Sequence, residues 1–111
     1  IEGGMSDHPR YALYQSASTC ILANKAGEPA DYTATIAGKC CESGDLIQEH
    51  TLIQKPEEGD ILAVLSTGAY NYSMAPNYNR NLKPAVVMVS RGKSRIVVKG
   101  ETYEDLVRND V

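Results

Sequence analysis

The feature that most constrains the fold of this chain is a series of short runs rich in β-favouring residues, each bounded by turn formers. Clusters such as residues 25–29 and 55–59, which contain glycine and proline, interrupt the runs. Residues 84–90 and 95–99 form a predicted hairpin around residues 91–94. Six short strands with little helix predict a mainly β domain, a small β-barrel or sandwich. The first four predicted strands cover residues 19–23, 32–37, 45–54 and 60–66.

The remaining segments predict short helices and one long loop. Residues 6–9, Ser-Asp-His-Pro, are typical of a helix opening, so a helical turn is expected over residues 10–14. Residues 67–81 are rich in Tyr and Asn and lack a strand period, which favours a short helix with a loop that can carry function. Thr102 is expected to cap a terminal helix. At 111 residues, positions 1–111 fit one domain.

Charge and hydropathy exclude several classes of partner. The net charge is −3, and acidic and basic residues are interspersed, so no basic stripe is available for nucleic acid. The longest apolar runs, residues 61–65 and 85–89, are too short to cross a bilayer, and the N-terminus lacks a signal pattern. We therefore expect a cytoplasmic protein that binds neither nucleic acid nor membrane.

The cysteines and histidines do not predict a disulfide or a metal centre. There are three cysteines, and Cys40 and Cys41 are adjacent, which suits neither a disulfide framework nor zinc-ligand spacing. Reduced thiols are the simplest interpretation. His8 and His50 lack a neighbouring Cys or acidic residue at ligand spacing, so no metal site is expected.

The segment from Cys41 to Asp45 is a candidate for chemistry. Side chains alternate along a strand, so only one of the two adjacent cysteines can face a given site. A thiol with an ordinary pKa of about 8.5 is mostly protonated near neutrality and can donate a proton. Glu42 beside it could bind an ammonium group. From spacing alone the structural alternative is the commoner one, with buried cysteines followed by a turn at residues 43–45.

Two further groups of residues could bind a ligand. Arg10 and Tyr14 are four residues apart, so one helical turn would place both on one face, where they could grip a carboxylate. Tyr70 follows Gly68 and Ala69 after an apolar strand, and the small residues would let a ligand approach the backbone. The alternatives are a surface arginine beside a packed tyrosine, and a tyrosine that caps the core.

Residues 41–45, Cys-Glu-Ser-Gly-Asp, resemble the loop that fold-type III pyridoxal-phosphate-dependent decarboxylases contribute across a dimer interface. The form with Glu after Cys is similar to diaminopimelate decarboxylases, whereas ornithine and arginine decarboxylases usually carry Asp there. Tyr11 stands where the family pattern has Pro. Other matching pieces occur in the same order and extend the resemblance over nearly the whole chain: residues 3–7, 10–14, 68–70 and 101–105.

The resemblance implies half of an active site. In the family, Cys41 would be the general acid, Glu42 would bind the distal ammonium of the substrate, and Tyr70 would contact cofactor and substrate. Arg10 and Tyr14 would bind the distal carboxylate. The reaction implied is decarboxylation of meso-2,6-diaminopimelate to L-lysine and carbon dioxide in lysine biosynthesis.

The cofactor implied is pyridoxal 5′-phosphate, whose Schiff-base lysine would lie in an N-terminal (β/α)8 barrel that no segment here matches. Residues 1–16 would be the junction from that barrel and residues 17–111 the β domain. The chain starts at Ile1, which suggests a piece of a longer protein. We expect a homodimer with a shared active site, and an isolated fragment without activity.

Two other functions stay open. One is a noncatalytic dimerisation or regulatory β domain, against which the intact Cys41 and Glu42 argue. The other is a related decarboxylase that acts on ornithine, arginine or carboxynorspermidine. Glu42 together with Arg10 favours diaminopimelate, because diaminopimelate differs from lysine by one carboxylate and an arginine fork binds that group through two hydrogen bonds.

Overall fold

The structure is a computed structural model that describes residues 1–111, and it is built mainly from short strands. Two short α-helices and three 3₁₀ turns connect or flank the strands. Each α-helix has only five residues, so neither could span a bilayer. The elements, in chain order, are α1 (Arg10–Tyr14), β1 (Cys20–Leu22), η1 (Ala23–Lys25), β2 (Tyr32–Ala37), β3 (Leu46–Ile53), β4 (Leu62–Val64), η2 (Tyr72–Met74), η3 (Tyr78–Arg80), β5 (Val86–Ser90), β6 (Lys93–Val98) and α2 (Tyr103–Val107).

The six strands form three antiparallel pairs, β1 with β4, β2 with β3 and β5 with β6. The predicted mainly β class is therefore confirmed, but the strands do not close into a barrel. Each sheet has only two strands, and β1 and β4 pair over three residues each. Sequence periodicity locates strands but does not determine which strand edges pair, so it cannot predict whether the strands close into a barrel.

A small apolar core lies between the first two sheets. Its centre is Cys20, Ile36, Ile47 and Ile53, with Ala34, Leu62 and Val64 packed against it. Burial raises the pKa of the Cys20 thiol, as expected for a cysteine that packs as a small apolar residue. Only 13 of 111 residues are buried, so this core is thin.

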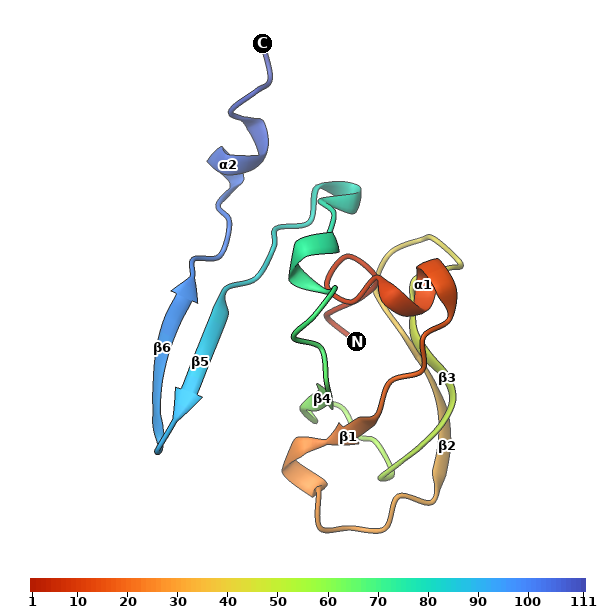
Figure 1. Ribbon diagram of the computed structural model, residues 1–111. Helices are drawn as coiled ribbons and strands as arrows, with labels where there is room; N and C mark the ends of the chain where they lie inside the picture. Colours follow the sequence, from red (N-terminus) through yellow and green to blue (C-terminus); the bar gives the residue numbers. More distant parts are fainter.

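The hairpin β5–β6 and helix α2 project away from the other four strands (Figure 1). Arg91 and Gly92 have φ values of 50° and 71°, which gives a two-residue turn of type I′. The turn is thus shorter than the four residues expected, because β6 already begins at Lys93. Val89 is 71% exposed and Ile96 63%, so the hairpin carries an uncovered apolar surface.

Helix α2 begins as predicted. Thr102 accepts a hydrogen bond from the amide of Asp105, and the Asp105 carboxylate accepts one from the amide of Thr102. This reciprocal capping box satisfies two amides that a helix start leaves free, and it lowers the pKa of Asp105. Both the helix and its cap follow from the local sequence alone.

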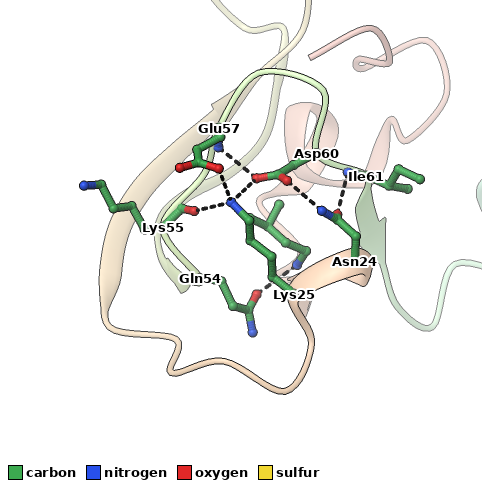
Figure 2. A network of polar contacts seen from close by, with 8 residues as sticks. Asn24, Lys25, Gln54, Lys55, Glu57, Asp60 and Ile61 are labelled. Atoms are coloured by element: carbon green, nitrogen blue, oxygen red, sulfur yellow. Dashed lines mark hydrogen bonds and ion pairs between the residues drawn. The ribbon is translucent and has the colours of Figure 1, made fainter.

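A polar network joins η1 to the turn between β3 and β4 (Figure 2). The Lys25 ammonium lies 2.8 Å from Asp60 and 3.1 Å from Glu57, and it also donates to the carbonyl of Lys55. Asn24 donates to Asp60 at 2.7 Å and accepts from the amide of Ile61. These contacts hold β1 beside β4, because they join the residues that follow β1 to the residues that precede β4.

The network predicts acid sensitivity of the fold. Lys25, together with Asn24, lowers the pKa of Asp60 from 3.8 to about 2. The unfolded chain binds this proton more readily, so the stability that ionised Asp60 contributes is present above about pH 4 and is lost as the pH falls toward 2. In Asp60→Asn, the thermal midpoint should therefore vary less between pH 5 and pH 2 than in the wild type, measured by circular dichroism.

Asp31→Asn is the matched control, because Asp31 is exposed and forms no ion pair. This variant should keep the acid sensitivity of the wild type. An unchanged pH dependence in Asp60→Asn would mean that the Lys25 network does not stabilise the folded chain at neutral pH.

Candidate functional site

The Cys41 loop, residues 38–44 between β2 and β3, presents the predicted thiol and carboxylate. The amide of Gly38 donates to the carbonyl of Asp45 at 2.8 Å, and the amide of Asp45 donates to the carbonyl of Glu42 at 3.0 Å. These bonds close the loop at its base. Cys41, Glu42 and Ser43 lie at its exposed tip.

The two adjacent cysteines have different surroundings. Cys40 is half-buried, and its Sγ accepts a hydrogen bond from Nδ2 of Asn81 at 3.5 Å. Cys41 is exposed, and its thiol is not hydrogen-bonded within the chain. Glu42 Oε1 accepts from the amide of Gly44 at 2.9 Å, which orients the carboxylate and leaves Oε2 free. The geometry therefore offers one free thiol beside one oriented carboxylate.

Helix α1 brings Arg10 and Tyr14 together, as the spacing predicts. Arg10 Nε donates to the Tyr14 hydroxyl at 2.9 Å, and Nη2 donates to Ser16 at 3.1 Å. A guanidinium has five N–H donors, so these two bonds leave three for a ligand. The Tyr14 oxygen accepts from Arg10, which leaves its own O–H free to donate. The pair can thus hold one carboxylate by several hydrogen bonds.

Tyr11 fastens α1 to the sheet. Its hydroxyl donates to Glu49 Oε2 on β3 at 2.6 Å, and this bond is the main reason why the pKa of Tyr11 is raised. The departure from the family pattern, in which Pro is usual, therefore adds a contact that holds the helix carrying Arg10.

Tyr70 lies in a turn after β4 and is 66% exposed. Its φ of 62° is unusual for a bulky residue, and such conformations persist only where neighbours enforce them. Asn71 supplies that restraint, since its Nδ2 donates to the carbonyls of Thr67 at 2.6 Å and Ala69 at 3.4 Å. The turn therefore holds the ring of Tyr70 out toward solvent.

A buried histidine lies behind this turn. His8 Nε2 is 2.9 Å from the Ser18 hydroxyl, and burial is the main cause of the lowered pKa of His8. His8 Nδ1 and Asn71 Oδ1 are buried without a hydrogen bond. His8 and Asn71 line the same cavity, so the segment before α1 reaches the residue that restrains Tyr70.

No hydrogen bond or ion pair within the chain joins the Cys41 loop, the Arg10–Tyr14 pair and Tyr70 to one another.

Two residues that the sequence patterns do not select, Tyr78 and Asn81, approach the Cys41 loop. Tyr78 is half-buried, and burial followed by the charge of Glu42 raises its pKa. Their signal was only the polar stretch after β4, which predicts a functional loop without selecting residues within it.

Comparison with known proteins identifies the family. Residues 1–68 match the family described as "Pyridoxal-dependent decarboxylase, C-terminal sheet domain". The chain belongs to this family. The match covers the loop that carries Cys41 and the helix that carries Arg10, whereas Tyr70 lies two residues beyond it.

Curated members of the family extend the match to the whole chain. The chain is 53% identical over 111 residues to the diaminopimelate decarboxylase of Bacillus subtilis, and 50% identical over 111 residues to that of Staphylococcus aureus. The two matches cover 100% and 99% of this chain, but only 25% and 26% of the two relatives. The chain thus spans about a quarter of the length of these decarboxylases.

Solved decarboxylases of the family share the fold. A diaminopimelate decarboxylase from M. jannaschii in complex with L-lysine superposes with a TM-score of 0.88 at 35% identity, over 100% of this chain and 25% of that one. The Helicobacter pylori enzyme complexed with L-lysine gives a TM-score of 0.85 at 30% identity, over 99% and 27%. About a quarter of each solved decarboxylase therefore has the same overall backbone arrangement as this chain.

The family implies pyridoxal phosphate, and Tyr70 stays the predicted contact of this chain with that cofactor. Tyr70 offers an exposed, restrained aromatic ring. A complete site also needs a lysine that bonds covalently to the cofactor. Lys39, in the Cys41 loop, is exposed and pairs with Glu2 at 3.2 Å, and Lys25 is held by two carboxylates. Both ammonium groups are thus already paired with carboxylates of this chain.

Proposed function

We propose that this chain is the C-terminal sheet domain of a diaminopimelate decarboxylase, which converts meso-2,6-diaminopimelate to L-lysine and carbon dioxide in lysine biosynthesis. The observation that carries the proposal is the display of an exposed thiol and carboxylate on one loop and an arginine–tyrosine pair on one helix. Both features lie in a chain that is 53% identical to the B. subtilis decarboxylase.

Cys41 is the general acid in this proposal. Loss of carbon dioxide leaves an electron pair on the α-carbon, and the bound cofactor supplies the electron sink that stabilises it. The Cys41 thiol then donates its proton to that carbon, which completes L-lysine. Exposure of Cys41 at the loop tip lets it reach a substrate held by another part of the protein.

The other residues recognise the end of the substrate that does not react. The free oxygen of Glu42 binds the distal ammonium, and Arg10 with Tyr14 binds the distal carboxylate. Tyr70 contacts cofactor and substrate from its restrained turn. Ornithine and arginine lack the distal carboxylate, so the Arg10–Tyr14 pair supports diaminopimelate over them.

The whole enzyme is proposed to be a cytoplasmic homodimer in which Cys41 acts in the active site of the opposite subunit. Residues 1–16 form the junction from a (β/α)8 barrel, and residues 17–111 form the β domain. The uncovered apolar surface of β5–β6 supports burial against further protein, because isolated two-stranded hairpins are only marginally stable.

The test compares the isolated chain with the complete enzyme. The purified 111-residue chain is expected to form no lysine from meso-diaminopimelate with added pyridoxal phosphate, because it lacks the cofactor lysine. Joined to the barrel of its own polypeptide, it should release lysine and carbon dioxide. Lysine formation by the chain alone would contradict the proposed division of the site.

A substrate panel separates the alternatives. The complete enzyme should prefer diaminopimelate over ornithine, arginine and carboxynorspermidine. Preference for any of these would identify a related decarboxylase instead. Absence of turnover on all four, with the protein folded and dimeric, would favour the noncatalytic dimerisation or regulatory domain.

A further inference from the structure

Asp45, at the base of the Cys41 loop, carries a carboxylate that the proposed reaction does not use. The residue is only 2% exposed. Its Oδ1 accepts from the amide of Met5 at 2.6 Å, and its Oδ2 accepts from the amide of Cys40 at 2.8 Å. None of the four ion pairs of the chain includes Asp45. A buried carboxylate is costly unless it is satisfied, and here main-chain amides satisfy it.

Two neighbouring glycines leave the space that this carboxylate occupies. A Cβ atom on Gly38 or on Gly4 would collide with the Asp45 carboxylate oxygens. Both positions must therefore lack a side chain for the main chain to approach so closely. One glycine lies at the start of the loop and the other lies in the N-terminal segment, so the two contacts come from different parts of the chain.

Asp45 therefore holds the Cys41 loop through both its main chain and its side chain. The main chain of Asp45 already closes the loop through Gly38 and Glu42. Its side chain adds a bond to Cys40, the residue next to Cys41, and a bond to Met5, which leads within five residues to Arg10. The thiol loop and the segment that carries the Arg10–Tyr14 helix are thus anchored on the same carboxylate.

We propose that Asp45 is a positioning residue that fixes the main chain of the Cys41–Glu42 loop for proton transfer. The inference rests on the proposed function of Cys41, since it gives Asp45 a role only through that residue. Its physical basis is that a misplacement of about 1 Å can lower the rate of a positioned reaction by about a hundredfold. Asp45 touches neither substrate nor cofactor in this proposal.

The test uses Asp45→Asn in the full-length enzyme. This change preserves shape, but the new NH₂ group faces an amide donor, so one of the two anchors is lost. We expect kcat to fall by about tenfold or more. In a Cys41→Ala background, the same change should lower kcat by less than about a further twofold, because the proton donor that Asp45 positions is already absent. Equal losses in both backgrounds, or unchanged kcat in Asp45→Asn, would overturn the positioning role.

Hydrogen exchange provides a readout that does not depend on catalysis. In Asp45→Asn, peptides that contain the amides of Met5 and Cys40 should exchange faster, while those of β5 and β6 stay unchanged. If Cys41→Ala leaves kcat intact, the proposed acid is wrong, and faster exchange confined to Met5 and Cys40 would still support the anchoring by Asp45. Unchanged exchange at both amides would overturn it.

Gly38→Ala is a second variant that retains the charge, and it serves if Asp45→Asn does not fold. Its Cβ would push the carboxylate away from Cys40. The same loss of kcat and the same local exchange are expected. Gly27→Ala is the control, because a Cβ there meets no other atom within 4 Å. Wild-type exchange and kcat in Gly38→Ala would contradict the proposal.

Discussion

Replacement of Cys41 by alanine in the full-length enzyme is expected to lower kcat by about 10²–10⁴-fold, the usual contribution of a positioned general acid. The thiol is exposed at the loop tip, and no hydrogen bond within the chain occupies it. Because alanine removes the proton donor and leaves Glu42, Arg10 and Tyr14 in place, KM for diaminopimelate should change little. Steady-state lysine formation measures both constants.

Cys40→Ala is the matched control for this prediction. It removes a neighbouring thiol that is half-buried and engaged with Asn81, so it tests the packing of the loop and not the proton donor. Its loss of kcat should be much smaller than that of Cys41→Ala. Equal losses in the two variants would assign the effect to loop structure, and unchanged turnover in Cys41→Ala would exclude it as the acid.

The strands and helix ends could be predicted because local residues determine them. The Thr102–Asp105 capping box and the Arg10–Tyr14 contact each depend on a fixed spacing along one helical turn. Likewise, β2 and β3 coincide closely with runs bounded by glycine and proline. In these elements the decisive contacts lie within a few residues of one another.

Contacts between distant residues could not be predicted in the same way. Met5 and Asp45 are 40 positions apart, and Asn81 and Cys40 are 41 apart, so no periodicity reveals either bond. The sequence places Asp45 only at a turn and at the start of a strand, whereas burial and two main-chain amides make it the anchor of the loop. The pairing of strands into separate sheets is a long-range property of the same kind.

The Arg10–Tyr14 pair makes the second large effect predictable. Arg10→Ala should lower kcat/KM for diaminopimelate by about 30- to 10³-fold, which corresponds to the roughly 2–4 kcal/mol lost when one partner of a hydrogen-bonded charge pair is removed. Arg10→Lys should give an intermediate loss, because lysine keeps the charge but not the fork that also holds Tyr14 and Ser16.

Inhibition by product analogues isolates the carboxylate contact. L-lysine retains the carboxylate and ammonium of the distal end, whereas 1,5-diaminopentane lacks any carboxylate. Arg10→Ala should therefore weaken inhibition by L-lysine and leave inhibition by the diamine unchanged, while Arg95→Ala, at an exposed arginine on β6, should alter neither. Equal weakening of both inhibitors would show that Arg10 supports the fold of the site and does not recognise the distal carboxylate.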